Sequence, residues 1–227
     1  MKNALLIGGS RGLGLALVDE HLSRGWQVTA TVRSRSEQLE SLRDSAAGRL
    51  AIERLDVNDR PQLLSLSQRL QGDAFDLLFL NAGILIGGAT PLEDVPDDDV
   101  ASIFFTNAIN PVRIADALAD NVTDGGMIVF MSSVLGSIGT NEDGRAELYR
   151  ASKAALNSLI RSFRARHTER DITVLAMHPG VVRTDMGGPD APLDIATSVR
   201  GVADVIENRW ANGGQAFVDY RNQIIPW

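Results

Sequence analysis

The sequence predicts an α/β fold in which helices cover both faces of a parallel β-sheet. Short apolar runs alternate with longer segments of helical periodicity along all 227 residues. Several of the runs are nearly continuous in Val, Ile, Leu, Phe and Ala, as expected for strands that are buried on both faces. The first run leads directly into a glycine-rich turn that opens a helical segment. Regular alternation of this kind indicates βαβ units with right-handed crossovers.

No internal repeat, low-complexity tract or linker divides the chain, so we expect a single domain over residues 1–227. The predicted strands are 3–8, 27–32, 50–57, 75–80, 126–133, 172–178 and 215–220. The predicted helices are 12–24, 36–46, 60–70, 97–121, 147–168 and 194–209, of which 147–168 carries a wide apolar stripe.

The composition narrows the possible classes of function. The chain has no cysteine, which excludes disulfides, thiolate metal sites and a cysteine nucleophile. His21, His167 and His178 share no ligand spacing, so we expect no metal site. The formal charge of −7 disfavours nucleic acid as a partner. No apolar run approaches the ~20 residues of a membrane span. With no signal peptide recognised, we expect a cytoplasmic protein that binds no membrane.

A phosphate-binding loop is predicted directly after the first strand, with the sequence Gly8-Gly9-Ser10-Arg11-Gly12-Leu13-Gly14. Glycines let the chain turn sharply and bring backbone N–H groups against a pyrophosphate, and the following helix adds the positive end of its dipole. A tight packing turn that binds no ligand is the alternative. No Gly-Lys-Ser/Thr follows, which excludes the Walker A loop of P-loop NTPases.

The end of the second strand predicts the choice of nicotinamide cofactor. NAD enzymes place Asp or Glu there to hold the ribose 2′-hydroxyl. Here the strand ends in Arg33-Ser34-Arg35, and no acid precedes Glu37. Arg33 and Arg11 can both form charge-assisted bonds to a 2′-phosphate. We therefore expect NADP(H), with NAD(H) less favoured; the alternative is that Arg33 and Arg35 are solvated residues at a helix entry.

Tyr149 and Lys153 give the sharpest chemical signal. The chain has only two tyrosines and two lysines, and one of each stands at this i, i+4 spacing on a helix face. A neighbouring ammonium lowers the pKa of a phenol, so we expect Tyr149 to act as a general acid or base at neutral pH. Ser133 ends the strand 126–133 and can donate a hydrogen bond to a reacting oxygen. A turn-forming role for this serine is the alternative.

Taken together, these motifs resemble the short-chain dehydrogenase/reductase family over essentially the whole chain. The matching pieces are, in order, Gly8–Gly14, Asp56-Val57, Asn81-Ala82-Gly83, Asn107, Ser133, Tyr149, Lys153 and Pro179-Gly180. Within the family, Met131–Gly139, Tyr149–Asn157, His178–Gly188 and the C-terminal Ile-Pro-Trp are similar to the C-signal-like and sniffer-type carbonyl reductases. The resemblance implies one Rossmann-like, doubly wound domain with seven parallel strands in the order 3-2-1-4-5-6-7.

The resemblance also implies a role for each matching residue. The catalytic set would be Asn107, Ser133, Tyr149 and Lys153, with a water on Asn107 linking Lys153 to solvent. Tyr149 would give its proton to a carbonyl oxygen, and Lys153 would bind the nicotinamide ribose. Asp56 and Val57 would hold adenine, and Asn81, Ala82 and Gly83 would pass the adenosine ribose. The nicotinamide would be seated by Pro179, Gly180, Val182 and Thr184.

Two segments are expected to shape the substrate pocket. Ser137–Leu148 is longer than the commonest family spacing, so we expect it to bulge over the site; Arg145 could meet an acidic substrate group, although an exposed loop arginine is the simpler interpretation. The segment between Thr184 and Asp194 is short, which predicts an open, permissive pocket. His178 stands at a strand end before Pro179 and is interpreted as a turn residue rather than a base.

The leading hypothesis is NADPH-dependent reduction of an aldehyde or ketone to an alcohol, or the reverse, on a small-molecule substrate. One alternative is a nucleotide-binding sensor of the same fold with little turnover. A second is epimerisation or dehydration on the same scaffold. By family likeness, the helices at 97–121 and 147–168 would form the seam of a homodimer or homotetramer.

Overall fold

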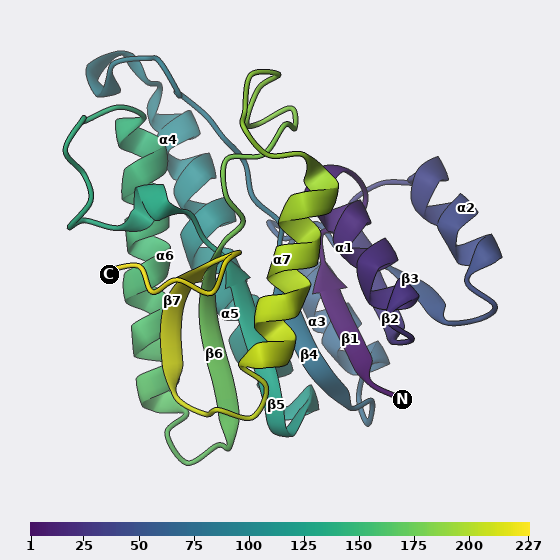
Figure 1. The fold of residues 1–227 in the computed structure, drawn as a ribbon. Helices are drawn as coiled ribbons and strands as arrows, with labels where there is room; N and C mark the ends of the chain where they lie inside the picture. The colour runs from purple at the N-terminus through teal and green to yellow at the C-terminus, as the bar shows by residue number, and fades with distance from the viewer.

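The computed structural model describes residues 1–227, and its seven strands form one parallel sheet in the order β3-β2-β1-β4-β5-β6-β7 (Figure 1). The strands are β1 (Asn3–Ile7), β2 (Gln27–Val32), β3 (Leu50–Arg54), β4 (Phe75–Leu80), β5 (Val122–Met131), β6 (Ile172–His178) and β7 (Gln215–Asp219). The predicted fold class and strand order are confirmed. The order reverses between β1 and β4, where doubly wound sheets bind ligands at the carboxyl ends of the strands.

Seven α-helices connect the strands: α1 (Gly12–Ser23), α2 (Glu37–Ser45), α3 (Arg60–Arg69), α4 (Asp97–Phe104), α5 (Asn110–Leu118), α6 (Glu147–Arg166) and α7 (Ile195–Asn208). Side chains cap three of them at the N-terminus. Ser36, Asp59 and Asp194 each accept a backbone N–H from the first turn of α2, α3 and α7. None of the helices is both long and apolar enough to cross a bilayer.

Two hydrophobic cores sandwich the sheet, because successive strand residues point to opposite faces. Leu5 and Ile7 of β1 belong to the core beneath α3, α5 and α6, which contribute Leu66, Ile114 and Phe163. Ala4 and Leu6 of the same strand belong to the core beneath α1, α2 and α7. Full burial on both faces explains why the strands read as continuous apolar runs.

The helix predicted over 97–121 is not continuous. A π-helical turn, Phe105–Ile109, separates α4 from α5, and a short 3₁₀ turn, Ala119–Asn121, follows α5. Pro111 has no N–H and cannot bond the carbonyl of Asn107, four residues before it. Irregular turns of this type often mark functional sites, and this one contains Asn107, a residue of the predicted catalytic set.

Candidate active site

A groove of about 880 Å³ runs along the carboxyl edge of the sheet. It collects residues from the glycine loop, from the ends of β2 to β6, from α4 and α6 and from the segment after β6. Sixteen predicted site residues line it: Gly8, Ser10, Arg11, Gly12, Leu13, Gly14, Arg33, Asp56, Val57, Asn81, Ala82, Gly83, Tyr149, Lys153, Pro179 and Thr184. Asn107, Ser133, Gly180 and Val182 do not line it.

Hydrogen bonds from the side chains of Thr31 and Asn81 fix the glycine loop at Gly8. The backbone N–H of Gly8, whose φ is +94°, donates to Thr31 Oγ1 at 3.1 Å. The amide of Asn81 donates to the carbonyl oxygen of Gly8 at 2.8 Å. A methyl group on Gly14 would overlap that same carbonyl, so this position admits only glycine. The loop therefore packs closely against its neighbours, which is the geometry that the approach of a pyrophosphate to a glycine turn requires.

Three arginines lie near the end of β2, and the structure distinguishes them. Arg33 lines the groove and makes no ion pair. Arg35 pairs instead with Glu40 of α2 at 2.7 Å and does not line the groove. Arg11 lines the groove, and its Nη1 lies 3.0 Å from Asp185 Oδ2. Arg33 is therefore the arginine best placed to meet a phosphate on the ribose.

The end of the groove beside Asp56 and Val57, where adenine is expected, contains residues that the sequence motifs did not indicate. Asn58, Ser102 and Thr106 line the groove beside Asp56 and Val57. The Asn58 amide donates to Thr106 Oγ1 at 3.0 Å, which ties the segment after β3 to the turn after α4. Asn58 follows Asp56-Val57 directly in the sequence, so its position was a signal for this edge. Thr106 reaches the site only through the π-helical turn, which the sequence pattern does not reveal.

Tyr149 and Lys153 lie one turn apart on α6 and both line the groove. The Lys153 ammonium donates to the carbonyl of Met131 at 2.9 Å and lies 5.7 Å from the centre of the Tyr149 ring. The pKa of Tyr149 is not depressed as expected. Burial raises the pKa of Tyr149 to about 12, and the neighbouring Ser133 hydroxyl only partly opposes this rise. Burial also lowers the pKa of Lys153 to about 8.

The two serines at the end of β5 have different partners. The hydroxyl of Ser132 is 2.7 Å from Asn157 Oδ1, so it donates into the protein interior. Ser133 accepts the N–H of Leu135 at 3.2 Å, and its hydroxyl is a neighbour of the Tyr149 side chain. Gly136 lets the turn at Val134–Gly136 lie against α6, since a Cβ there would stand 2.9 Å from the backbone of Lys153. This close approach brings Ser133 to Tyr149.

Asn107 stands behind the groove with its side chain fully engaged. Its Oδ1 accepts the N–H of Ile84 at 2.8 Å, and its Nδ2 donates to the Ile84 carbonyl at 2.8 Å and to Ser152 Oγ at 3.1 Å. Gly83 separates it from Lys153: a Cβ on Gly83 would be 3.3 Å from Asn107 Oδ1 and 3.6 Å from Lys153 Nζ. The water-holding role of Asn107 stays a prediction.

The segment after β6 closes the end of the groove that contains Tyr149, where the nicotinamide is expected. Arg183, Thr184, Asp185, Met186, Gly188 and Pro189 all line it. The sulfur of Met186 is 3.9 Å from the Tyr149 hydroxyl. The predicted short segment thus reaches the centre of the site. Gly180 and Val182 stand outside, because Val182 is buried in a backbone bridge to Leu193 and Gly180, with φ of +85°, packs on Tyr220.

The segment Ser137–Leu148 does not cover the groove, and that expectation is wrong. No residue from 137 to 148 lines the groove. Instead, the segment folds against the N-terminal half of α6 beside a second, smaller cavity (Figure 1). Arg145 is an exposed loop arginine that pairs with Asp143 at 2.8 Å. His178 is not the expected turn residue but the last residue of β6; it pairs with Asp219 of β7, and its carbonyl accepts the N–H of Tyr220 at 2.9 Å.

Among known proteins, a family model described as short chain dehydrogenase matches residues 2–192 of this chain. The chain is a short-chain dehydrogenase/reductase. The C-signal protein of Myxococcus xanthus is 38% identical over 154 residues, covering 67% of this chain and 92% of that protein. The predicted likeness to C-signal-like reductases is therefore confirmed.

Two solved structures extend the family assignment to the whole chain. A short-chain dehydrogenase/reductase of Burkholderia multivorans, determined with bound NADP, is 43% identical with a TM-score of 0.97 and covers 100% of this chain and 99% of its own. The carbonyl reductase Sniffer of Drosophila melanogaster is 29% identical with a TM-score of 0.89, and both chains are covered in full. The predicted likeness to sniffer-type reductases is also confirmed.

The groove of this short-chain dehydrogenase/reductase fits a dinucleotide on its own geometry. The cradle at Gly8 and Gly14 has no room for side chains, as close approach of a pyrophosphate requires. No carboxylate stands at the end of β2 to repel a 2′-phosphate, and Arg33 faces the groove without an ion-pair partner. These features are the ones expected for NADP(H).

Proposed function

We propose that this protein is an NADPH-dependent reductase that converts aldehydes or ketones to alcohols, and can run the reverse reaction. The observation that carries the proposal is the placement of Tyr149 and Lys153 together in the groove, one turn apart on α6, with Ser133 close to Tyr149. A nicotinamide cofactor supplies the hydride when bound. The residues of the chain supply the proton and fix the oxygen that receives it.

In this proposal Tyr149 is the proton donor. Because the pKa of Tyr149 is raised to about 12, the hydroxyl holds its proton throughout the neutral range and can give it to a carbonyl oxygen. Ser133 donates a second hydrogen bond to the same oxygen, where negative charge develops. The Lys153 ammonium, protonated below a pKa of about 8, would stabilise the tyrosinate that remains and hold the nicotinamide ribose.

NADP(H) is proposed as the cofactor because Arg33 stands free at the groove and no acid replaces it. The Burkholderia relative, which binds NADP, supports this choice, and the carbonyl reductase Sniffer supports the carbonyl substrate. The sensor alternative is disfavoured, because nucleotide binding alone has no need of Asn107, Ser133, Tyr149 and Lys153 together. An epimerase or dehydratase would leave the cofactor unconsumed.

The oligomer is proposed to be a homodimer or homotetramer that joins through α4, α5 and α6. These helices lie together on one face of the sheet (Figure 1). The large side chain of Phe105, in the turn between α4 and α5, is exposed. Sedimentation velocity of the purified protein tests this proposal, which a monomer at micromolar concentration would contradict.

The decisive experiment is NADPH oxidation by the purified protein with aldehydes, ketones, quinones and diketones. We expect turnover in the wild type and a loss of at least about a thousandfold in Tyr149→Phe, which lacks the transferable proton. Tyr220→Phe is the matched control, because Tyr220 is the other tyrosine of the chain and does not line the groove. NADPH binding without oxidation by any carbonyl would overturn the proposal.

A further inference from the structure

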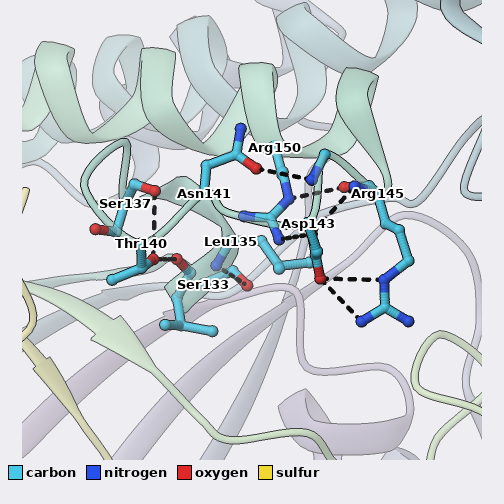
Figure 2. A network of polar contacts seen from close by, with 10 residues as sticks. Ser133, Leu135, Ser137, Thr140, Asn141, Asp143, Arg145 and Arg150 are labelled. Atoms are coloured by element: carbon cyan, nitrogen blue, oxygen red, sulfur yellow. Dashed lines mark hydrogen bonds and ion pairs between the residues drawn. The ribbon is translucent and has the colours of Figure 1, made fainter.

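Arg150 is a buried charge directly beside the proposed proton donor. Its side chain is only 8% exposed, although Arg150 lies near the N-terminal end of α6. A buried guanidinium is costly unless it is paired and hydrogen-bonded. Arg150 Nη2 lies 2.6 Å from Asp143 Oδ1, and Nε donates to the carbonyl oxygen of Arg145 at 2.7 Å (Figure 2). Both contacts reach back to the loop that precedes α6.

These contacts replace an ordinary helix cap. Ala146, the residue before α6, has a left-handed backbone with φ of +55°, and no side chain caps the helix. Side chains on a helix lean toward its N-terminus, so Arg150 reaches Asp143 and Arg145 from within the first turns. The same turns carry Tyr149. Their attachment to the preceding loop therefore depends on Arg150.

The loop itself carries a network of separate polar contacts, the first of which lies at the other proposed catalytic hydroxyl. Ser133 accepts the N–H of Leu135 at 3.2 Å, and Thr140 Oγ1 lies 3.4 Å from the carbonyl oxygens of Val134 and Ser137. Asn141 Oδ1 accepts the N–H of Gly144 at 3.3 Å, next to Asp143 (Figure 2). The two ends of this network are thus Ser133 and the residue that follows Tyr149.

Arg150 acts from outside the groove. It lines the second cavity, of about 280 Å³, together with Ser137, Asn141 and Glu147, whereas Tyr149 lines the groove. Successive helix residues point about 100° apart, which explains how neighbours can face different cavities. Arg150 therefore has no contact with a substrate or cofactor in the groove, and any effect it has on the reaction passes through Tyr149.

We propose that the ion pair between Arg150 and Asp143 is a positioning device, which fixes the first turn of α6 so that the Tyr149 hydroxyl stays aligned with Ser133. This inference rests on the proposed function, in which Tyr149 gives the proton. A displacement of about 1 Å in a reacting group can cost about a hundredfold in rate. Lys153 is held separately, by the Met131 carbonyl and by the packing of Gly136. Loss of the pair should therefore lower kcat and leave cofactor binding intact.

The pair is expected to persist over the whole working range of pH. Hydrogen bonds from Arg145 and the charge of Arg150 lower the pKa of Asp143 to about 2. The carboxylate thus stays ionised between pH 5 and pH 9. A loss of kcat caused by breaking the pair should be the same across this range, which separates it from an effect on a titrating catalytic group.

The kinetic test uses Arg150→Met, Asp143→Ala and the double variant. The matched control is a second Arg–Asp pair whose arginine is also on α6. Arg166 Nη2, at the C-terminal end of α6, lies 2.7 Å from Oδ2 of Asp116 on α5. Asp116, like Asp143, also meets a second basic side chain. We expect kcat to fall about 10- to 100-fold in the first set, with KM for the carbonyl and Kd for NADPH within about twofold of wild type. Arg166→Met and Asp116→Ala should keep kcat within about twofold. The double variant should lose no more than Arg150→Met alone, since both remove one interaction.

A second readout does not depend on activity. With ring-labelled ¹³C-tyrosine, the protein gives signals from only two tyrosines, and Tyr220→Phe assigns the one from Tyr149. Asp143→Ala should shift or broaden the Tyr149 signal, and Asp116→Ala should not. If the wild type reduces no carbonyl, the proposed function fails while this spectrum still decides the positioning role. An unchanged Tyr149 signal, or unchanged kcat in folded Asp143→Ala, would overturn the inference.

Discussion

Asp185 reaches across the mouth of the groove to Arg11, with 3.0 Å between its Oδ2 and the arginine Nη1. The two residues come from opposite sides of the groove, one from the segment after β6 and the other from the glycine loop. Both side chains are largely exposed, at 89% and 78%. In the proposed function, the same guanidinium would also meet a phosphate group of the cofactor. The carboxylate of Asp185 and that phosphate would then compete for Arg11.

This competition predicts that Asp185→Asn binds NADPH more tightly than the wild type. An exposed ion pair contributes at most about 1 kcal/mol, so the gain in affinity should not exceed about fivefold. Salt should reduce it, because exposed charges are screened. Fluorescence titration of NADPH at low and high ionic strength measures the effect. Asp190→Asn, an exposed acid of the same segment, is the control, and an equal gain there would contradict the competition.

Arg33 and Arg35 should differ in their effect on the choice of cofactor. Arg33 faces the groove, whereas Arg35 is paired with Glu40. Hydrogen bonds to charged groups contribute about 1.5–3 kcal/mol, so Arg33→Ala should raise KM for NADPH at least tenfold and leave KM for NADH nearly unchanged. Arg35→Ala should change neither value by more than about twofold. Steady-state kinetics with both cofactors decide this, and equal losses with NADPH and NADH in Arg33→Ala would count against the assignment.

Lys153 should be a residue whose removal stabilises the protein. Its folded pKa of about 8 lies below the ordinary value of 10.5, because burial disfavours the ammonium. The unfolded chain thus binds more protons between these values, so the free-energy penalty is full below pH 8 and is relieved as the pH rises toward 10.5. We expect Lys153→Met to raise the free energy of unfolding at pH 7 by about 1–2 kcal/mol, after the loss of the bond to Met131 is counted.

Urea unfolding of the wild type and Lys153→Met at pH 7 and pH 9.5 measures this difference, which should shrink at the higher pH. The variant should also lose carbonyl reduction. A variant that is less stable than the wild type at pH 7 would show that the ammonium is better solvated than its burial implies.

The sequence predicted the sheet well because burial on both faces leaves a simple pattern. The bounds of β2, β4 and β6 match the predicted runs, and apolar residues dominate β4 and β6. The motifs also placed Tyr149, Lys153, Arg33 and the glycine loop in one groove, because parallel strands bring their carboxyl ends to one edge. These features depend on periodicity and chain order, which a single sequence displays.

Other features depend on contacts between distant segments and could not be predicted. The π-helical turn before Pro111 contains Asn107, whose side chain bonds to Ile84 and Ser152. The segment Ser137–Leu148 lies away from the groove, with Asp143 paired to Arg150 of α6. The high pKa of Tyr149 follows from burial, which spacing alone does not measure. The contact between Met186 and the Tyr149 hydroxyl corresponds to no motif in the sequence.

The stability of the protein should fall as the pH drops below neutral, and His178 should be a main cause. Burial lowers the pKa of His178 to about 4 from an ordinary 6.5, although Asp219 partly opposes this. Below pH 6.5 the unfolded chain takes up a proton that the folded protein refuses, so the stabilising contribution is full above 6.5 and is lost progressively down to pH 4. Burial shifts the pKa of His21 in the same direction.

At pH 5 the loss due to His178 alone should be about 2 kcal/mol relative to pH 7.5, from the free energy that each pKa unit represents. His178→Gln removes the titrating group, so urea unfolding should show a smaller fall in stability between these two pH values than in the wild type. A second variant, His21→Gln, should reduce the fall independently, because the two side chains lie in different parts of the fold. An equal fall in the wild type and in His178→Gln would show that His178 takes up a proton in the folded protein as readily as in the unfolded chain. The Nδ1 atom of His178, which the structure buries without a hydrogen-bond partner, would then have to be solvated or hydrogen-bonded.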